Sequence, residues 1–359
     1  MKVLFVINDA HGWAGTERVT NLIANGLSAR FEVEVLSLRP RPQNACGYPY
    51  NPEVKLFYLP LAGGIRTFLA SNVHVLRFVE QASPDVIILS GVGEIKNFIK
   101  VASMRRRHRP KLIAWEHFNA AYASRHLSRR IAARSCDVIV SLTKKDAEDW
   151  RQMLRPRAVV SIPNPVPEFP ERAASLDTNR ILALGRLEDQ KRFDLLIDAF
   201  ALFAQRHPGW YLRIRGSGSK EAELRDKLCV LGLQDKMEIL PPTHDVAEEY
   251  AGASMYVLSS GYEGFSMTLV EAMAAGVPCV SFDCPNGPSE IIKNDHDGFI
   301  VPLYDVVALA EKMGRLADDV TLRRQMGAAA RQNIHRYEAG PILEQWSALL
   351  HALGAGAGE

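Results

Sequence analysis

The sequence has few cysteines and no long apolar run, and each shortage excludes a class of protein. Its 359 residues include five cysteines, with no Cys-x-x-Cys pair and no histidine cluster at zinc-site spacing, which excludes a disulfide scaffold and a zinc module. Apolar runs such as 3–7 and 86–89 are far shorter than the ~18 residues that span a bilayer. We therefore expect a cytoplasmic protein with reduced thiols and an opening strand rather than a signal peptide.

The chain also has almost no net charge, +2 from 43 basic and 41 acidic residues. This balance hides an asymmetry, because residues 1–170 hold 24 Lys and Arg against 14 Asp and Glu, whereas residues 171–359 hold 19 against 27. Hydrophobic residues make up 47% of the chain, which is typical of a globular protein and excludes a disordered one. A basic half followed by an acidic half predicts that the halves face different partners.

Short apolar segments alternate with helical patterns from end to end. Strands are predicted at 2–7, 32–38, 54–59, 85–89, 111–115, 137–141, 159–162, 180–184, 211–215, 237–240, 255–258, 279–282 and 298–301. Helices are predicted between most of them, including 17–28, 68–81, 94–108 and 145–154, with a last helix from 339 to 353. This alternation predicts an α/β protein whose parallel sheets are covered on both faces.

A proline-rich segment, 163–170, separates two such series. Its four prolines cannot continue a helix or a central strand. We therefore predict a linker between two doubly wound, Rossmann-like domains, 1–165 and 171–338, with the segment 339–359 available to pack back on the first. Ligands bind outside the carboxyl ends of such strands, so the active site is expected in the cleft between two facing domains.

The loop after the first predicted strand contains Gly12 and Gly15. Glycine lets backbone N–H groups approach an anion at the start of a helix. The loop lacks the GxGxxG fingerprint, and strand 32–38 is followed by Arg39 rather than an acidic residue, which disfavours an NAD site. The loop is either a phosphate-binding turn or a plain strand-to-helix turn.

Two cations follow the strand at 180–184. Arg186 leaves the strand end and Lys191 precedes the next predicted helix. An arginine offers a planar fork and a lysine a point charge, so the two could clamp a diphosphate. Solvated surface charges are the alternative.

Two glutamates flank the start of a later predicted helix. Glu263 lies in the loop after strand 255–258, and Ser266 is expected to cap the helix. Glu271, one turn inside that helix, could reach a ribose, and Glu263 could reach the sugar beyond the phosphate. Three backbone N–H groups would then point out of the positive helix end toward a phosphate: those of Met267, Thr268 and Leu269.

Together these motifs resemble the retaining glycosyltransferases of family 4, which have the GT-B fold. The resemblance is carried by the two cations, by Glu263-Gly-Phe with Glu271-Ala-Met, by Ala275-Gly-Val-Pro and by the block 283–292. It is most specific over 180–302, and the Gly15-Thr-Glu-Arg loop and the linker extend it over the whole chain. The segment Cys-Pro-Asn-Gly-Pro-Ser-Glu is most similar to bacterial enzymes that build surface polysaccharides from UDP-sugars.

The resemblance implies a role for each candidate residue. Arg186 and Lys191 would neutralise the donor diphosphate, and Glu271 would hold the ribose. Glu263 and His117, which follows strand 111–115, would be the catalytic candidates beside the donor sugar; a structural loop histidine is the alternative for the latter. The other nucleotide-sugar-binding residues would be Gly15, Phe265, Ser266, Met267, Thr268 and Leu269.

Two positions depart from the family pattern. The first loop usually carries paired glycines and here has Ala14-Gly15, so the Cβ of Ala14 is expected to narrow it. The usual glycine after the clamp lysine is replaced by Arg192, which is expected to add a positive charge next to the site.

The resemblance implies a retaining transfer from a nucleotide-diphosphate sugar, expected to be a UDP-sugar, to a hydroxyl of a glycan or lipid-linked acceptor in bacterial polysaccharide, lipopolysaccharide or glycoconjugate synthesis. The transferred unit would be a hexose or N-acetylhexosamine. No cofactor and no metal are expected, because cations and helix amides can stabilise the leaving diphosphate. A nucleotide-sugar epimerase of the same fold and a nucleotide-sugar-binding protein without activity are the alternatives.

The basic excess of the first half gathers at 105–111, 125–134 and 151–157. One interpretation is peripheral contact with the inner face of the cytoplasmic membrane, because each basic residue near an anionic surface adds about 1 kcal/mol. Solvated helix faces are the other. Nucleic-acid binding is disfavoured, since the clusters lack interleaved aromatic residues and the pI is only about 8.2.

Overall fold

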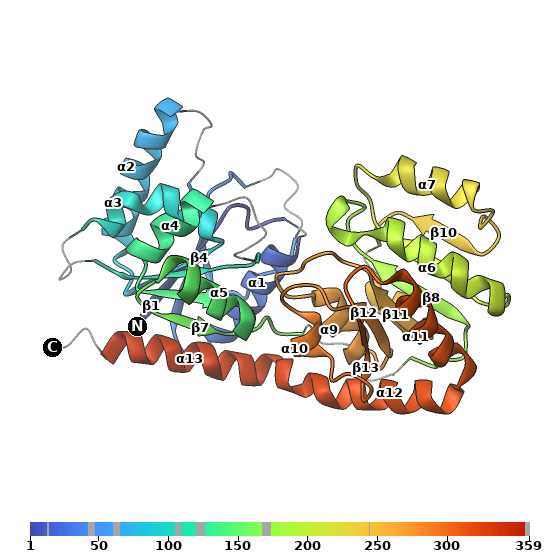
Figure 1. The fold of residues 1–359 in the computed structure, drawn as a ribbon. Coiled ribbons are helices and arrows are strands. Elements are labelled where there is room, and N and C mark those ends of the chain that lie inside the picture. The colour runs from blue at the N-terminus through green and yellow to red at the C-terminus, as the bar shows by residue number, and fades with distance from the viewer. Residues whose placement is uncertain are drawn as a thin grey trace. The chain divides into compact units, whose positions relative to one another are not determined.

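The computed structural model describes residues 1–12, 14–41, 47–59, 65–104, 109–119, 126–166, 174–243 and 245–355. The chain forms two compact units (Figure 1). The first unit comprises Met1–Pro165 together with Ala339–Glu359, and the second comprises Val166–Glu338.

The first unit is built on a seven-stranded parallel sheet of order β3-β2-β1-β4-β5-β6-β7. Its strands are β1 (Lys2–Ile7), β2 (Glu32–Ser37), β3 (Lys55–Tyr58), β4 (Val86–Ser90), β5 (Lys111–Trp115), β6 (Val138–Ser141) and β7 (Val159–Ser161). Its helices are α1 (Gly15–Leu27), α2 (Ile65–Ala82), the 3₁₀ helix η1 (Val92–Phe98), α3 (Ile99–Ala102), α4 (His126–Ser135), α5 (Lys144–Leu154) and α13 (Ala339–Ala355).

The second unit repeats the design with a six-stranded parallel sheet of order β10-β9-β8-β11-β12-β13. Its strands are β8 (Arg180–Leu184), β9 (Tyr211–Arg215), β10 (Met237–Leu240), β11 (Met255–Leu258), β12 (Cys279–Phe282) and β13 (Gly298–Val301). Its helices are η3 (Asp189–Lys191), α6 (Phe193–Arg206), α7 (Glu221–Val230), α8 (Val246–Ala251), α9 (Met267–Ala274), α10 (Pro288–Ile291), α11 (Val306–Asp318), α12 (Val320–Asn333) and η4 (Ile334–Tyr337).

Both strand orders place β1 or β8, the first strand of its unit, at an inner position where the connections change direction. This is the doubly wound arrangement, and it confirms the predicted α/β class. The inner strands are apolar on both faces: every residue of β4 is buried, as is every residue of β11 and β12. Loops after the carboxyl ends of these strands therefore supply the residues available to a ligand.

Two elements of the first unit differ from the sequence prediction. The helix predicted at 94–108 is wrong, because η1 is a 3₁₀ helix and α3 ends at Ala102, while residues 105–108 lie outside the described part. Gly93 near the start of this segment weakens α-helical propensity. Helix α4 was not predicted, because its sequence is strongly polar, with three arginines and two serines among its ten residues.

The last helix, α13, packs on the first unit through α1. Trp346 of α13 is fully buried, and its ring lies 5.0 Å from that of Trp115. A Cβ on Gly26 of α1 would lie 2.4 Å from Leu343 Cδ1, so a larger residue there would require the Leu343 side chain to move. Arg30 also pairs with Glu344 of α13.

Two further observations bear on the protein's environment. None of the described helices combines the length and the apolar character needed to cross a membrane. The described cysteines, Cys136, Cys229, Cys279 and Cys284, are free thiols; Cys46 lies outside the described residues.

Candidate functional site

The loop between β8 and α6 carries both predicted cations of the second unit, Arg186 and Lys191. Lys191 ends the one-turn helix η3. Gly185, directly after β8, has φ +156°, and a Cβ there would lie 2.9 Å from Lys191 Cε. Glycine at this position therefore allows the lysine side chain to pass close to the strand end.

A carboxylate from the adjacent strand β11 meets Lys191. Glu263, in the loop after β11, accepts hydrogen bonds from Lys191 Nζ at 2.7 Å and from Ser260 Oγ at 2.6 Å. The side chains of Lys191 and Glu263 are 13% and 7% exposed. Arg186 lies exposed on the same β8–α6 loop, with its Nη2 3.1 Å from Gln190 Oε1. Two cations and a carboxylate thus lie on the loops after two adjacent strands.

The start of α9 follows Glu263 directly. Ser266 occupies the N-cap position, but the prediction that its side chain caps the helix is wrong: its ψ of 89° departs from extended cap geometry, and no capping bond forms. Its Oγ is buried without a hydrogen-bond partner among the described residues. The N–H of Leu269 already donates to Ser266 O at 3.1 Å, so the outward amides to consider are those of Met267 and Thr268.

Glu271 faces Tyr250 one turn into α9. The Tyr250 hydroxyl lies 3.1 Å from Glu271 Oε2 and 2.9 Å from Thr268 O. Burial raises the pKa of Tyr250 well above its ordinary value, so the hydroxyl stays protonated and donates. Glu271 is only 5% exposed. The contact fixes one carboxylate oxygen and orients the group.

The loop that carries Glu263 is supported from two sides. Phe265 is buried, and its ring packs edge-on against Tyr337 at 5.4 Å between centroids, which gives this predicted donor contact a packing role. Pro285 O, in the block 283–292, accepts a hydrogen bond from the N–H of Glu263 at 3.2 Å. This block therefore lies directly beside the carboxylate loop.

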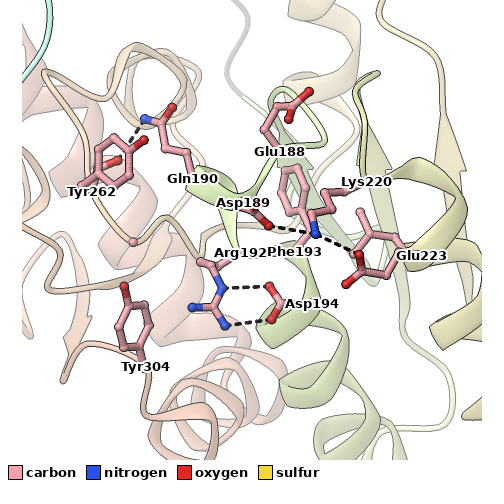
Figure 2. A pocket seen from close by; sticks show the side chains of 12 residues that line it. Glu188, Asp189, Gln190, Arg192, Phe193, Asp194, Lys220, Glu223, Tyr262 and Tyr304 are labelled. Atoms are coloured by element: carbon pink, nitrogen blue, oxygen red, sulfur yellow. Dashed lines mark hydrogen bonds and ion pairs between the residues drawn. The ribbon is translucent and has the colours of Figure 1, made fainter. Parts of the chain in front are cut away.

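Arg192 explains why the resemblance has glycine after the clamp lysine. Its backbone is left-handed, with φ 46° and ψ 42°, a conformation that costs a non-glycine residue about 1 kcal/mol or more. The guanidinium donates two hydrogen bonds to Asp194, at 3.0 and 2.8 Å, and lies 5.0 Å from the ring centre of Tyr304 (Figure 2). Arg192 was expected to add a positive charge next to the site, but Asp194 neutralises this charge.

In the first unit, α1 begins at Gly15, with Ala14 at the N-cap. Both residues are exposed. A Cβ on Gly15 would meet no atom of the described chain within 4 Å, so internal packing does not require glycine there. A ligand that approaches the start of the helix closely would still favour glycine at this position.

His117 follows β5 and is half-buried, with its ring 4.5 Å from that of Trp115. Its Nε2 is buried without a partner among the described residues. Burial lowers the pKa of His117 to about 3, so the imidazole is neutral at pH 7. Beside it, Glu116 Oε2 accepts from Arg129 Nε of α4 at 2.8 Å, and Glu116 Oε1 accepts from the N–H of Phe118 at 3.1 Å. This pair holds the turn that carries His117.

The basic clusters of the first unit are partly used inside it. Arg129 is 1% exposed, and Arg109 pairs with Asp137 at 2.7 Å with 7% of its side chain exposed. These two arginines therefore do not belong to an outer basic surface, which corrects their grouping with the others. Residues 105–108 and Arg125 lie outside the described residues. The described arginines of 125–134 and 151–157 that are exposed are Arg130, Arg134, Arg151, Arg155 and Arg157.

One Asp-x-Asp sequence, Asp295-His296-Asp297, was missed at the sequence level. Asp297 is fully buried and accepts from the N–H of Lys293 at 2.7 Å and from Asn333 Nδ2 at 2.6 Å. Asp295 pairs with Lys312 at 3.4 Å. These carboxylates stabilise the turn before β13. Within the described ranges, no three His, Cys, Asp or Glu side chains are grouped as metal ligands.

Two family models match consecutive parts of the chain. The family described as Glycosyltransferase Family 4 matches residues 13–168, and the family described as Glycosyl transferases group 1 matches residues 167–333. Together they cover both units.

Relatives of similar length match almost end to end. The chain is 27% identical over 358 residues to an uncharacterized glycosyltransferase of Haemophilus influenzae, covering 97% of this chain and 99% of the relative. It is 26% identical over 367 residues to a Campylobacter jejuni enzyme named "GalNAc-alpha-(1->4)-GalNAc-alpha-(1->3)-diNAcBac-PP-undecaprenol alpha-1,4-N-acetyl-D-galactosaminyltransferase", covering 98% of each.

Solved structures share the fold. Anabaena HepE, crystallised with UDP-glucose, superposes with a TM-score of 0.78 at 19% identity and covers 98% of this chain and 100% of HepE. The S. aureus TarM structure with UDP superposes with a TM-score of 0.71 at 20% identity, covering 79% of this chain. The matched part spans 58% of the TarM chain.

Proposed function

Because this chain belongs to the GT-B glycosyltransferases of bacterial polysaccharide and lipopolysaccharide synthesis, with a family 4 domain followed by a group 1 domain, we propose that it is a retaining, metal-independent transferase that uses a UDP-sugar. The transferred unit is a hexose or N-acetylhexosamine, and the acceptor is a hydroxyl of a glycan or lipid-linked glycan. A solved neighbour holds UDP-glucose, and a relative is named for an undecaprenol-diphosphate acceptor. The second unit binds the donor in this proposal, and the first binds the acceptor.

The observation that carries this proposal is the contact of Lys191 with Glu263 at 2.7 Å. Both side chains are mostly buried, and both follow carboxyl ends of adjacent parallel strands, where ligands of such sheets bind. A lysine is a strong partner for a phosphate, and a carboxylate is a strong acceptor for sugar hydroxyls. One pair can therefore serve the two halves of a nucleotide sugar.

The leaving nucleoside diphosphate gains negative charge as its bond to the sugar breaks, so this charge is what the site must stabilise. In the proposed reaction Lys191 turns from Glu263 to the diphosphate, and Arg186 supplies a second cation. The amides of Met267 and Thr268 add the positive end of α9. Glu263, released from the lysine, accepts hydrogen bonds from the donor sugar.

The remaining candidates take supporting roles. Glu271, oriented by Tyr250, accepts the ribose hydroxyls, and the buried Ser266 hydroxyl donates to a phosphate oxygen. In the first unit we assign Gly15 as a phosphate contact and His117 as a contact of the donor sugar. With its pKa lowered to about 3 by burial, His117 is a neutral hydrogen-bonding group at pH 7 rather than a proton donor.

The substitution Lys191→Ala tests the proposal. A thermal-shift screen of UDP-, GDP-, ADP- and CMP-sugars first identifies the donor by its stabilisation of the chain. Lys191→Ala should then lower the transfer rate with that donor by about 10²–10³-fold, the loss typical of one preorganised charge contact. Full activity with unchanged donor affinity would contradict the assignment.

Lys227→Ala is the matched control. Lys227 also pairs with a carboxylate at 2.7 Å, Asp198, in the same unit, but it lies on α7 rather than on the loops after β8 and β11. This variant should keep the donor-dependent shift and the rate. An epimerised sugar formed from the UDP-sugar alone, without acceptor, would favour the epimerase instead.

We also propose that the outer face of α4 makes peripheral contact with an anionic membrane. Arg130 and Arg134 are exposed on it, and Leu127, 67% exposed, adds an apolar side chain. Basic residues near an anionic surface each add about 1 kcal/mol. Sedimentation with liposomes should need anionic lipid, weaken with salt, and fall in the double variant Arg130→Gln/Arg134→Gln; binding indifferent to lipid charge would contradict this.

A further inference from the structure

A separate cavity of the second unit takes no part in the proposed reaction. Its volume is about 340 Å³, within the range of small-ligand sites. It opens between η3, the first turns of α6 and α7, and the loops that carry Tyr262 and Tyr304 (Figure 2). No role in binding the nucleotide or its diphosphate has been assigned to these side chains.

The cavity is unsuited to an anion, because its cations are already paired. Its charged lining consists of Arg192, Lys220, Glu188, Asp189, Asp194 and Glu223. Asp194 binds Arg192 through two hydrogen bonds, and Lys220 Nζ lies 3.1 Å from Asp189 and 2.9 Å from Glu223 (Figure 2). Four carboxylates against two cations leave an excess of negative charge, which repels a phosphate or an acidic headgroup.

The aromatic ring of Tyr304 lines the same cavity. Tyr304 is 47% exposed; the Arg192 guanidinium lies over one part of its ring, 5.0 Å from the ring centre, and Phe282 packs edge-on with the ring at 6.3 Å between centroids, so the sugar would use the surface that these two contacts leave open. Phe193 is buried in the wall below. An exposed ring offers a flat apolar surface to the C–H face of a pyranose, and neighbouring carboxylates accept its hydroxyls. Together these groups have the chemistry that recognises a neutral sugar.

Gln190 lines this cavity and directly precedes Lys191 in the chain. Its Nε2 donates to Tyr262 O at 3.0 Å, and its backbone O accepts from the N–H of Gly261 at 2.8 Å. Its Oε1 accepts from Arg186 Nη2 at 3.1 Å. A ligand in the cavity therefore borders both loops of the donor site without occupying it.

We propose that the cavity is a second carbohydrate site, which binds one neutral saccharide unit. Tyr304 stacks on the pyranose ring, and the carboxylates beside Lys220 accept its hydroxyls. That this unit comes from a glycan chain rests on the proposed function; the binding itself does not.

Saturation-transfer NMR on the full chain tests the binding, with UDP at saturation to fill the nucleotide position. The probes are methyl α-D-glucopyranoside and methyl α-D-galactopyranoside, with glucose 1-phosphate as the anionic comparator. At least one neutral glycoside should bind more tightly than the phosphate. Tyr304→Ala should weaken it about 10-fold, whereas Tyr304→Phe, which keeps the ring, should stay within about 2-fold.

Two glutamates of α7 provide a matched pair of variants. Glu223 and Glu221 both lie in the first turn and each pairs with a cation, but only Glu223 lines the cavity. Glu223→Ala should weaken glycoside binding several-fold and Glu221→Ala should leave it unchanged.

Unchanged binding in Tyr304→Ala, equal effects of the two glutamate variants, preference for glucose 1-phosphate, or no glycoside binding would each overturn the proposal. The UDP-induced thermal shift, measured on the same samples, separates this result from the proposed function. Loss of glycoside binding with an intact UDP shift in Tyr304→Ala supports a separate site. A wild-type chain that binds glycosides but not UDP would contradict the donor proposal alone.

Discussion

In each unit, a glutamate in the loop after a strand belongs to a buried ion pair, and these two pairs differ in how far they are sealed. In the first unit, Glu116 pairs with Arg129 at 2.8 Å, and the side chains are 0% and 1% exposed. In the second, Lys191 pairs with Glu263 at 2.7 Å, and the side chains are 13% and 7% exposed. The distances are nearly equal, so exposure is what separates them.

This difference distinguishes a structural pair from one available to a ligand. Charges sealed from water depend wholly on each other and on nearby hydrogen bonds, so loss of one partner leaves the other without compensation. A pair that is open on one side can exchange its partner for a ligand group. The sealed pair holds the turn of His117, and the open pair is itself the proposed donor contact.

The largest expected effect is that of Arg129→Met. The substitution keeps an apolar stem of similar length but removes the guanidinium that donates to the buried Glu116 carboxylate at 2.8 Å. The chain should lose about 3–5 kcal/mol of unfolding free energy, measured by urea denaturation followed by tryptophan fluorescence. Lys191→Met should lose less, about 1–3 kcal/mol, because Glu263 keeps its bond from Ser260 and the pair is not fully sealed from solvent.

A double variant sharpens this comparison. Glu116→Gln combined with Arg129→Met removes both charges and should recover much of the lost stability, since no buried carboxylate then faces the position of the lost guanidinium. If the two methionine variants destabilise the chain equally, exposure does not distinguish the pairs and the comparison fails.

The two residues of the open pair were predicted as site residues, although not their contact with each other, whereas the sealed pair was not predicted at all. Lys191 and Glu263 belong to short motifs that follow strands, and parallel strands bring their carboxyl ends to one edge. Arg129 lies in an arginine-rich stretch that reads as solvated. Its burial depends on which side of α4 packs on η1, a long-range contact that no local pattern encodes.

The same distinction holds for the backbone. The apolar runs predicted the strands to within one residue at each end, because buried parallel strands must be apolar. The left-handed conformation of Arg192 was signalled only by the glycine that the resemblance has there. Its compensation by Asp194 and Tyr304 needs contacts across the fold. The sequence therefore predicted the strands and the residue types that follow them, but not which side chains contact each other.

A smaller effect is expected from replacing His117, because burial disfavours the protonated form of its imidazole in the folded unit. Burial lowers the pKa of His117 to about 3 from its ordinary 6.5. Below pH 6.5 the unfolded chain binds a proton that the folded chain does not, so this group lowers stability progressively as pH falls toward 3 and contributes nothing above pH 6.5. His117→Asn should reduce the stability loss between pH 7 and pH 5 by about 2 kcal/mol, because about 1.5 pH units lie below 6.5 at about 1.4 kcal/mol per unit.

Urea denaturation at the two pH values measures this. His74→Asn, an exposed histidine on α2, is the control and should follow the parent chain. A His117 variant with unchanged pH dependence would show that the imidazole is protonated inside the folded unit.

The smallest effect is expected from Ser266→Ala, and it extends the comparison from charges to a hydroxyl. Ser254 and Ser266 are both at most 1% exposed, but Ser254 Oγ accepts from the N–H of Thr178 at 3.0 Å, whereas Ser266 Oγ has no partner among the described residues. Ser254→Ala should cost about 1 kcal/mol of stability. Ser266→Ala should cost none and should weaken UDP binding about 2–3-fold in the thermal-shift assay. If Ser266→Ala instead destabilises the chain and leaves UDP binding intact, the start of α9 is sealed like the Glu116–Arg129 pair. A hydroxyl that matters for binding but not for stability is what an open site at this helix end requires.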